Sequence, residues 1–483
     1  MINIQQYYLD TFKVTVPELE KIIGIIQDGG SNYADLFFEN TSYRDLLLRD
    51  GEVSSGGFHV DYGVGIRALK GDKTGYAYSE NTDMASMTNA AKAASSIASG
   101  VRINATTEAM IDKPTKAYPG KPNPRADRYP MLQDWRDCPT SDFLPIMEDL
   151  KNRVEAKDSR IIKVMVILSS QVSDILMFNS SYELKYETRP LATLAVSVIY
   201  KSGNQVLNTH VSRSYRMGVE MFTDALLQEI ADAAVKNIDD KFEAKRPKGG
   251  QMPVVLGAGA SGILLHEAMG HAFEADFNRK GQSIFADKMG QKVCDSCINV
   301  VDDGTIPGNR GSLNFDDEGV PAQRTYMIKD GILTSYLHDR ISAKFYDVAP
   351  TGNGRRESFR YNPIPRMRAT YMESADTDPQ DIIASVKQGI YVDEFTNGQV
   401  KIGEGDFTFY VKSGYLIENG RLTQPINDVN IIGNGPKALA DIVAVGNDNK
   451  VDDSGWTCGK EQNVPVSCGM PTVLVKNLTV GGN

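Results

Sequence analysis

The chain changes character at residues 241–251, and this change constrains its fold more than any other feature of the sequence. The stretch is polar and contains one Pro and two adjacent Gly residues, which favours an exposed connection between domains. At 483 residues the chain is too long for a single hydrophobic core. We therefore predict two domains, residues 1–245 and residues 250–483.

Hydrophobic periodicity predicts different architectures on the two sides of this stretch. Before it, we expect helices at 5–27, 82–99, 141–157 and 219–238, and strands at 34–40, 63–69, 161–168, 173–179, 182–188 and 191–200. Short turns between adjacent extended runs imply antiparallel pairing. We read residues 112–140, rich in Pro and Lys, as a long surface connection.

After the boundary, strands bounded by Gly dominate. We expect them at 322–328, 331–338, 391–397, 399–403, 406–416 and 421–425. The predicted fold class is therefore α+β. It combines an α/β N-terminal domain that has a mostly antiparallel sheet with a β-rich C-terminal domain, and the helix expected after residue 260 lies at their junction.

Composition narrows the function and the location. A net charge of −10 argues against nucleic-acid binding, which needs clustered basic residues. The sequence has no apolar run of about 18 residues, as a membrane helix needs, and its start does not resemble a signal peptide. Five cysteines are too few for a disulfide framework and indicate a reducing compartment. We predict a cytoplasmic protein.

The segment 252–276 carries the residues most suited to chemistry. It reads as a short strand, a Gly-rich turn and a helix that starts near Ser261 and contains His266, Glu267 and His271. In zinc peptidases with an HExxH motif, two histidines on one helix face bind the metal and the Glu deprotonates water. Here the spacing is five, which separates the rings by about 140° on a regular helix. Both rings can face one ion only if a π-bulge, or a helix end near Gly270, distorts the helix.

Two other interpretations share this segment. The helix could simply carry two partly buried histidines. The glycines at 257, 259 and 262 also match a dinucleotide-binding fingerprint, but turn-rich β sequence follows where that site needs a second parallel strand. We expect these glycines to allow a tight turn and close helix packing.

A zinc site needs a third protein ligand, and spacing leaves several candidates open. These are Cys294, Cys297, Cys458, Cys468, Glu274, Asp276 and His338. The pair Cys294 and Cys297 forms a CxxC, which also fits a redox site, a structural zinc site or plain packing.

From this segment onward the chain resembles the TldD/PmbA (TldD/TldE) metallopeptidase family, formerly described as modulators of DNA gyrase. The likeness begins with HEAMGHAFEADFNRKG at 266–281. It continues in order through 301–304, 316–319, 351–358, 390–391, 415–420, 458–466 and the tail 477–482. The first half matches more loosely, mainly at 61–67 and 75–77.

The resemblance implies a specific site and activity. His266, His271 and Cys458 would bind Zn²⁺, and Glu267 would be the general base of a metallopeptidase. Members of the family enclose a central cavity and cleave unfolded or extended peptides, including leader peptides of antibacterial peptides and a labile antitoxin. The chain is similar to the motif-bearing TldD-like subunits, which form dimers, typically with a PmbA/TldE-like subunit that lacks the motif. Cys294, Cys297 and Cys468 lie outside the recognised pattern.

The resulting hypothesis is zinc-assisted amide hydrolysis of a peptide that pairs in extended form with a strand edge. His338, Arg355 and Arg356 are candidates for stabilising the oxyanion. Two alternatives stay open, a non-enzymatic metal-bound binding subunit and a regulator of nucleic acid or gyrase, which the acidic charge disfavours.

Overall fold

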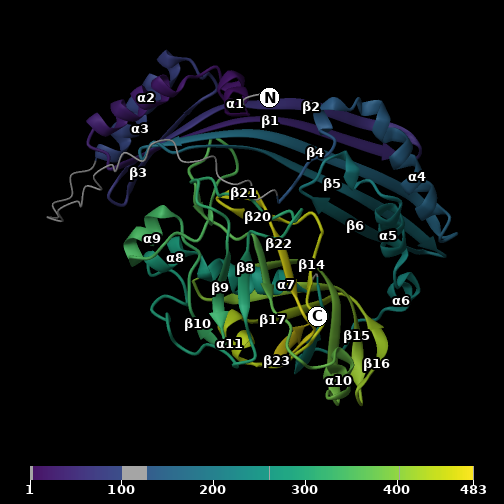
Figure 1. Ribbon diagram of the computed structural model, residues 1–483. Helices are drawn as coiled ribbons and strands as arrows, with labels where there is room; N and C mark the ends of the chain where they lie inside the picture. The colour runs from purple at the N-terminus through teal and green to yellow at the C-terminus, as the bar shows by residue number, and fades with distance from the viewer. Residues whose placement is uncertain (1–3, 101–127, 260, 402, 482–483) are drawn as a thin grey trace.

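The computed structural model describes residues 4–100, 128–259, 261–401 and 403–481. A long curved sheet, built by the first half of the chain, arches over a β-rich body built by the second half (Figure 1). Among the described residues, every strand of the arching sheet precedes residue 216 and every strand of the body follows residue 249. The α+β class is confirmed, whereas the domain bounds at 245 and 250 stay a prediction. Much of the connection expected at 112–140 lies outside the described residues.

The arching sheet is antiparallel throughout, in the strand order β3-β2-β1-β4-β5-β6. Its strands are β1 Tyr33–Arg49, β2 Glu52–Lys70, β3 Lys73–Ser79, β4 Ile161–Asn179, β5 Leu184–Ser202 and β6 Gln205–Tyr215. The sequence prediction was wrong in dividing β4 and β5 into two strands each. Pro190 is tolerated inside β5 because the pairing with β6 ends at Ala192, which leaves an edge where a missing N–H is harmless.

Helices cover the outer face of this sheet in two groups (Figure 1). The first group is α1 Ile4–Phe12, α2 Val16–Asp28 and α3 Met84–Ser99, and the second is α4 Leu144–Glu155 and α5 Asp224–Val235. Each group buries its apolar stripe in a separate hydrophobic cluster against the strands. Within the described chain, no helix is both long enough and apolar enough to cross a bilayer.

Two predicted helices are interrupted. The run 5–27 breaks at Lys13, which has a φ of 54°, and α2 restarts with a capping box between Thr15 and Glu18. The run 219–238 is a 3₁₀ turn, then α5, then α6 Ile238–Glu243, which follows Asn237 at a φ of 53°. A residue in the left-handed region ends a helix even where the apolar period continues.

The body contains a closed ring of strands. Strands β14, β7, β23, β17 and β15 pair in that order, and β14 also pairs with β15. Strand β16 extends β15, and β18 pairs with β23. The bounds are β7 Gly250–Leu256, β14 Gln388–Lys401, β15 Asp406–Glu418, β16 Arg421–Ile426, β17 Val429–Asn434, β18 Ile442–Val445 and β23 Val473–Gly481. The two strands predicted at 391–397 and 399–403 are thus one strand.

A second sheet packs beside the ring, in the order β10-β9-β8-β13-β22-β19. Its strands are β8 Val300–Asp303, β9 Arg324–Lys329, β10 Ile332–Leu333, β13 Ala369–Met372, β19 Lys450–Val451 and β22 Ser467–Met470. Of the strand predicted at 331–338, only β10 forms. Strands β8, β13 and β22 are too short and too uniformly buried to show a period of two in the sequence.

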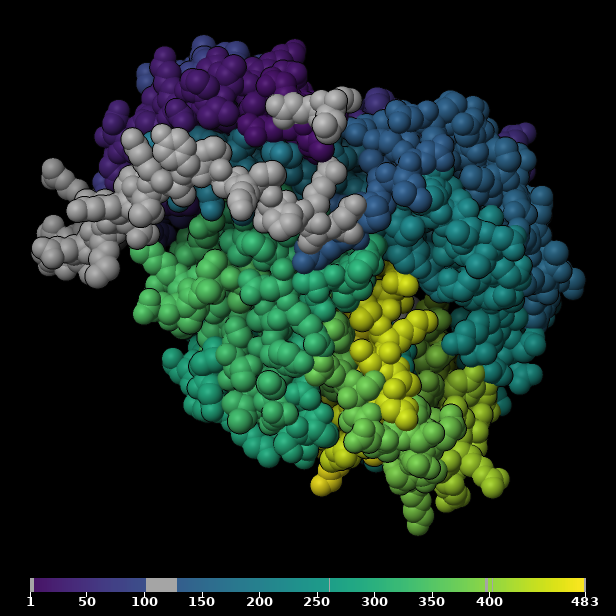
Figure 2. All heavy atoms as spheres, in the orientation of Figure 1, coloured from purple at the N-terminus to yellow at the C-terminus, as the bar shows by residue number. Residues whose placement is uncertain are grey.

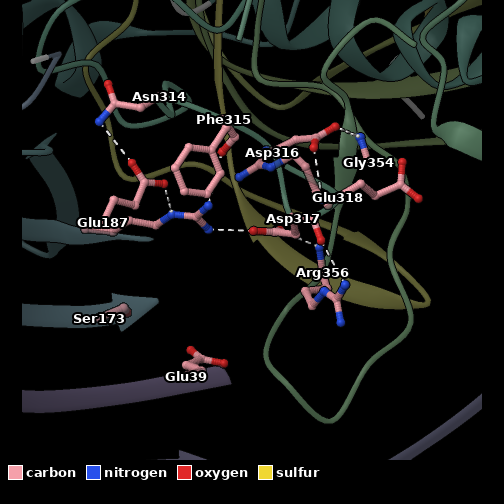
Figure 3. Close-up of polar contacts among 12 residues, drawn as sticks. Glu39, Ser173, Glu187, Asn314, Phe315, Asp316, Asp317, Glu318, Gly354 and Arg356 are labelled. Carbon is pink, nitrogen blue, oxygen red and sulfur yellow. Dashed lines mark hydrogen bonds and ion pairs between the residues drawn. The ribbon is translucent and has the colours of Figure 1, made fainter. Parts of the chain in front are cut away.

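A buried group of opposite charges, which we call the interface charge cluster, joins the arching sheet to the body (Figure 3). Arg67 of β2 contacts Asp35 of β1 and lies 2.6 Å from Glu318, while Arg189 of β5 lies 2.5 Å from Asp317. Arg356 donates from its backbone N–H to Asp317. On the face in Figure 2, the surface is hollowed between the yellow C-terminal segment and the teal segment to its right.

Candidate metal centre

The spacing of five between the two histidines is accommodated by the end of a helix. Helix α7, Gly262–Ala268, stops before Met269, whose backbone angles of −131° and −44° are not helical. A 3₁₀ turn, Gly270–Phe273, follows and carries His271. The predicted helix end near Gly270 is therefore observed, and the π-bulge is not. The two rings lie with centroids 5.2 Å apart at an angle of 81°.

Glycines allow the helix to pack closely, as expected. A Cβ on Gly262 would lie 2.4 Å from the backbone of Gly469 in β22, and one on Gly270 would lie 2.2 Å from the sulfur of Met367. Gly259 has a φ of 89°, in the region that favours glycine. Of the GxGxxG glycines, Gly262 thus allows close packing and Gly259 allows the turn.

Three ligand atoms converge on one point. The ring nitrogens of His266 and His271 and the sulfur of Cys458 lie within 4.8 Å of one another. Cys458 comes from β20, Thr457–Lys460, which forms a hairpin with β21, Gln462–Pro465. Its Sγ lies 3.3 Å from His271 Nε2. All three side chains are buried.

The donor set fits a cation. Neither ring nitrogen of His266 has a hydrogen-bond partner among the described residues, although both are buried. Such an orphaned polar group is rare in a folded protein unless a ligand satisfies it. Burial raises the pKa of the Cys458 thiol, but the two imidazoles outweigh this effect and lower it to about 4. A thiolate beside two imidazoles is a donor set that Zn²⁺ prefers.

Glu267 is the most accessible side chain of the group. It is 24% exposed, and its carboxylate lies 3.8 Å from His271 Nε2. A carboxylate at the open side of a buried ligand set can exchange protons with water and with a substrate.

Two of the candidates for a third ligand have another role. Glu274 accepts a hydrogen bond from, or shares a proton with, Nδ1 of His271 at 2.8 Å. Asp276 pairs with Lys460 at 2.8 Å. Spacing alone presented both as possible ligands, although a carboxylate three residues after a metal-binding His, as Glu274 is, could have indicated an orienting role.

The remaining candidate ligands, and the candidates for stabilising the oxyanion, lie elsewhere or face other groups. His338 contacts Ser342 and two tyrosines, and burial lowers its pKa to about 4. Arg355 donates to the backbone carbonyls of Met367 and Pro465, and Arg356 belongs to the interface charge cluster. Both guanidinium groups thus donate to acceptors outside the ligand set, while the Nε of each has no hydrogen-bond partner among the described residues. Among the described residues, Cys294, Cys297 and Cys468 do not join the converging ligand atoms.

Comparison with known proteins gives consistent matches. The family model described as the PmbA/TldA metallopeptidase C-terminal domain matches residues 249–482, and the model for domain 1 matches residues 34–98. A metalloprotease TldD homolog of Haemophilus influenzae is 37% identical over the full length of both chains. A zinc metalloprotease TldD homolog of Saccharolobus solfataricus is 29% identical over 71% of this chain and 79% of its own.

Solved structures share the fold. A candidate modulator of a DNA gyrase from Thermotoga maritima superposes with a TM-score of 0.75 at 20% identity, covering 96% of this chain and 99% of that one. TldE from Thermococcus kodakarensis has a TM-score of 0.73 at 18% identity, covering 96% and 100%.

Proposed function

The chain belongs to the PmbA/TldD metallopeptidase family, and from this premise we propose that it is a zinc-dependent peptidase for unfolded or extended peptides. The convergence of His266, His271 and Cys458 within 4.8 Å is the observation that carries the proposal. These three side chains would hold the ion. The name of the relative from Saccharolobus solfataricus supports zinc as the metal.

Glu267 is the proposed general base. When bound, zinc supplies Lewis acidity, which polarises the scissile carbonyl and acidifies the attacking water. Glu267 would accept the proton of that water and return it to the leaving amine. Its partial exposure beside an otherwise buried ligand set supports this role.

The substrate would bind in extended form through main-chain hydrogen bonds to a strand edge, which gives affinity with little sequence preference. The protein would act as a dimer, either with itself or with a PmbA/TldE-like subunit that lacks the motif. The likeness to a TldE structure supports a pairing of two subunits of similar fold. A cytoplasmic location stays a prediction.

The test compares wild type with Glu267→Gln on unfolded peptides, with the zinc content of each protein measured. We expect Glu267→Gln to keep its zinc and to lose about 10²- to 10⁴-fold in kcat, the usual contribution of a general base. Glu155→Gln, a change on an exposed helix surface, serves as the matched control and should retain wild-type turnover.

Wild-type turnover in Glu267→Gln would remove that residue from the base role. If zinc-loaded wild type cleaves no unfolded peptide, alone or with a motif-lacking subunit, the chain is a metal-bound binding subunit instead.

A further inference from the structure

The two ring nitrogens of His271 face different groups. Nε2 lies 3.3 Å from Cys458 Sγ, on the side where the ligand atoms converge, and Nδ1 lies 2.8 Å from Glu274 Oε2. Glu274 has no exposed surface. A carboxylate on one nitrogen of an imidazole keeps the proton there and leaves the other nitrogen free to bind a metal.

Lys460 connects this carboxylate to the strand that carries Cys458. Because side chains two residues apart on a strand share a face, Cys458 and Lys460 both point to the buried side of β20. Lys460 Nζ lies 3.1 Å from Glu274 Oε2 and 2.8 Å from Asp276 Oδ1. The ammonium also lies over the ring of Phe277. One side chain thus bridges β20 and the segment that follows His271.

Arg366 holds the backbone of the same hairpin. Its guanidinium donates to the carbonyl of Cys458 at 2.7 Å and to that of Gln462 at 2.7 Å. Its Nε lies 3.7 Å from Glu274 Oε1. The charges of this group are therefore balanced, with two carboxylates (the buried Glu274 and the partly exposed Asp276) and two buried cations (Lys460 and Arg366). Balanced charges are the condition under which an ion-pair network remains stable inside a protein.

We propose that Glu274 and Lys460 are positioning residues of the metal centre. Glu274 sets the tautomer and orientation of His271, and its ion pair with Lys460 holds the strand of Cys458 against that histidine. The ligands come from segments 187 residues apart in the sequence, so this pair assembles one site from two parts of the chain. The inference rests on the metal-binding part of the proposed function and does not depend on peptidase activity.

The experiment measures zinc affinity in the absence of any peptide, by competition with a chelator. Glu274→Gln should weaken zinc binding about 10- to 100-fold, the usual effect of removing a partner of a metal-bound histidine. Lys460→Met should weaken it in the same direction, and the double variant by less than the product of the two single effects because the residues act as a unit. Lys460→Arg, which keeps the charge, should recover part of the affinity.

Glu318→Gln is the matched control. Glu318 is an equally buried carboxylate with a cationic partner, Arg67, but it belongs to the interface charge cluster. It should lower the stability of the fold and leave zinc affinity unchanged. The spectrum of the cobalt-loaded protein provides a second readout, since the thiolate-to-metal band should shift in Glu274→Gln and not in Glu318→Gln.

Unchanged zinc affinity and an unchanged cobalt spectrum in folded Glu274→Gln would overturn the inference, even if that variant hydrolysed peptides slowly. If Glu274→Gln does not fold, Lys460→Met decides by the same two readouts. A wild type that binds zinc but cleaves no peptide would refute the peptidase and leave this inference standing. A wild type that binds no zinc would refute both.

Discussion

The interface charge cluster and the candidate metal centre are both buried, but they differ in how their charges are compensated. In the interface charge cluster, cations alternate with carboxylates, as where Arg67 lies between Asp35 and Glu318. At the candidate metal centre, three electron-pair donors converge on each other, and the ring nitrogens of His266 have no partner in the described part of the chain. A cluster whose opposite charges compensate one another has a structural role, whereas converging donors without a partner indicate a site for a cation.

Changes in the interface charge cluster should therefore affect stability, and changes in the candidate metal centre should affect metal binding. The largest effect is expected for Arg67→Met in the interface charge cluster, which leaves the carboxylates of Asp35 and Glu318 buried without their cation. Breaking a buried ion pair on one side destabilises a protein by about 3–5 kcal/mol. Chemical denaturation measures the loss, and zinc affinity should not change.

The control for that variant is Lys151→Met, which removes the half-exposed pair with Glu155 and should lower stability by at most about 1 kcal/mol. Equal losses in Arg67→Met and Lys151→Met would contradict the structural role of the interface charge cluster.

A somewhat smaller effect on the free energy of unfolding is expected from a change of pH, which acts on a carboxylate at the rim of the interface charge cluster. Glu39 accepts hydrogen bonds from Thr41 and from the backbone of Phe359, and burial raises its pKa from 4.5 to about 7. Between these values the folded protein keeps a proton that the unfolded chain has lost. The free energy of unfolding therefore falls as pH rises from about 4.5 to 7, by about 3 kcal/mol for this group, and is level above that range.

Glu39→Gln should remove this part of the pH dependence. Asp316, whose pKa is also raised by burial and by the neighbouring charge of Glu318, contributes in the same direction, so the informative quantity is the difference between variant and wild type. Identical pH profiles from denaturation experiments would show that Glu39 does not titrate in this window.

The smallest of the three effects concerns the metal centre. Zinc at about 100 times its Kd should stabilise the wild type by about 2.7 kcal/mol, seen as a rise in Tm. Cys458→Ser should lose this gain, because it removes a ligand. Cys468→Ser, also buried but outside the converging atoms, should keep it. A full zinc-dependent rise in Cys458→Ser would exclude Cys458 from the site.

The sequence was a good guide to features encoded over short distances. The strands of the arching sheet end before the stretch 241–251, and those of the body begin at Gly250, within it. Short turns between adjacent extended runs indicated antiparallel strands, and His266, Glu267 and His271 stood out as a group within one turn-and-helix segment. The predicted ends of helices and strands were less accurate. Single residues in the left-handed region, such as Lys13 and Asn237, interrupt helices although the apolar period continues past them.

What only the tertiary structure decided is which distant groups meet. Spacing could not choose among four cysteines and three other residues as a third ligand, whereas the hairpin of β20 and β21 brings Cys458 to His271. The same holds for Glu274, which the sequence presented as a possible ligand and the fold turns towards Nδ1 of His271. Local sequence specifies conformation over a few residues. A metal site depends on distances of a few ångströms between atoms far apart along the chain, and strand pairing and buried ion pairs set those distances.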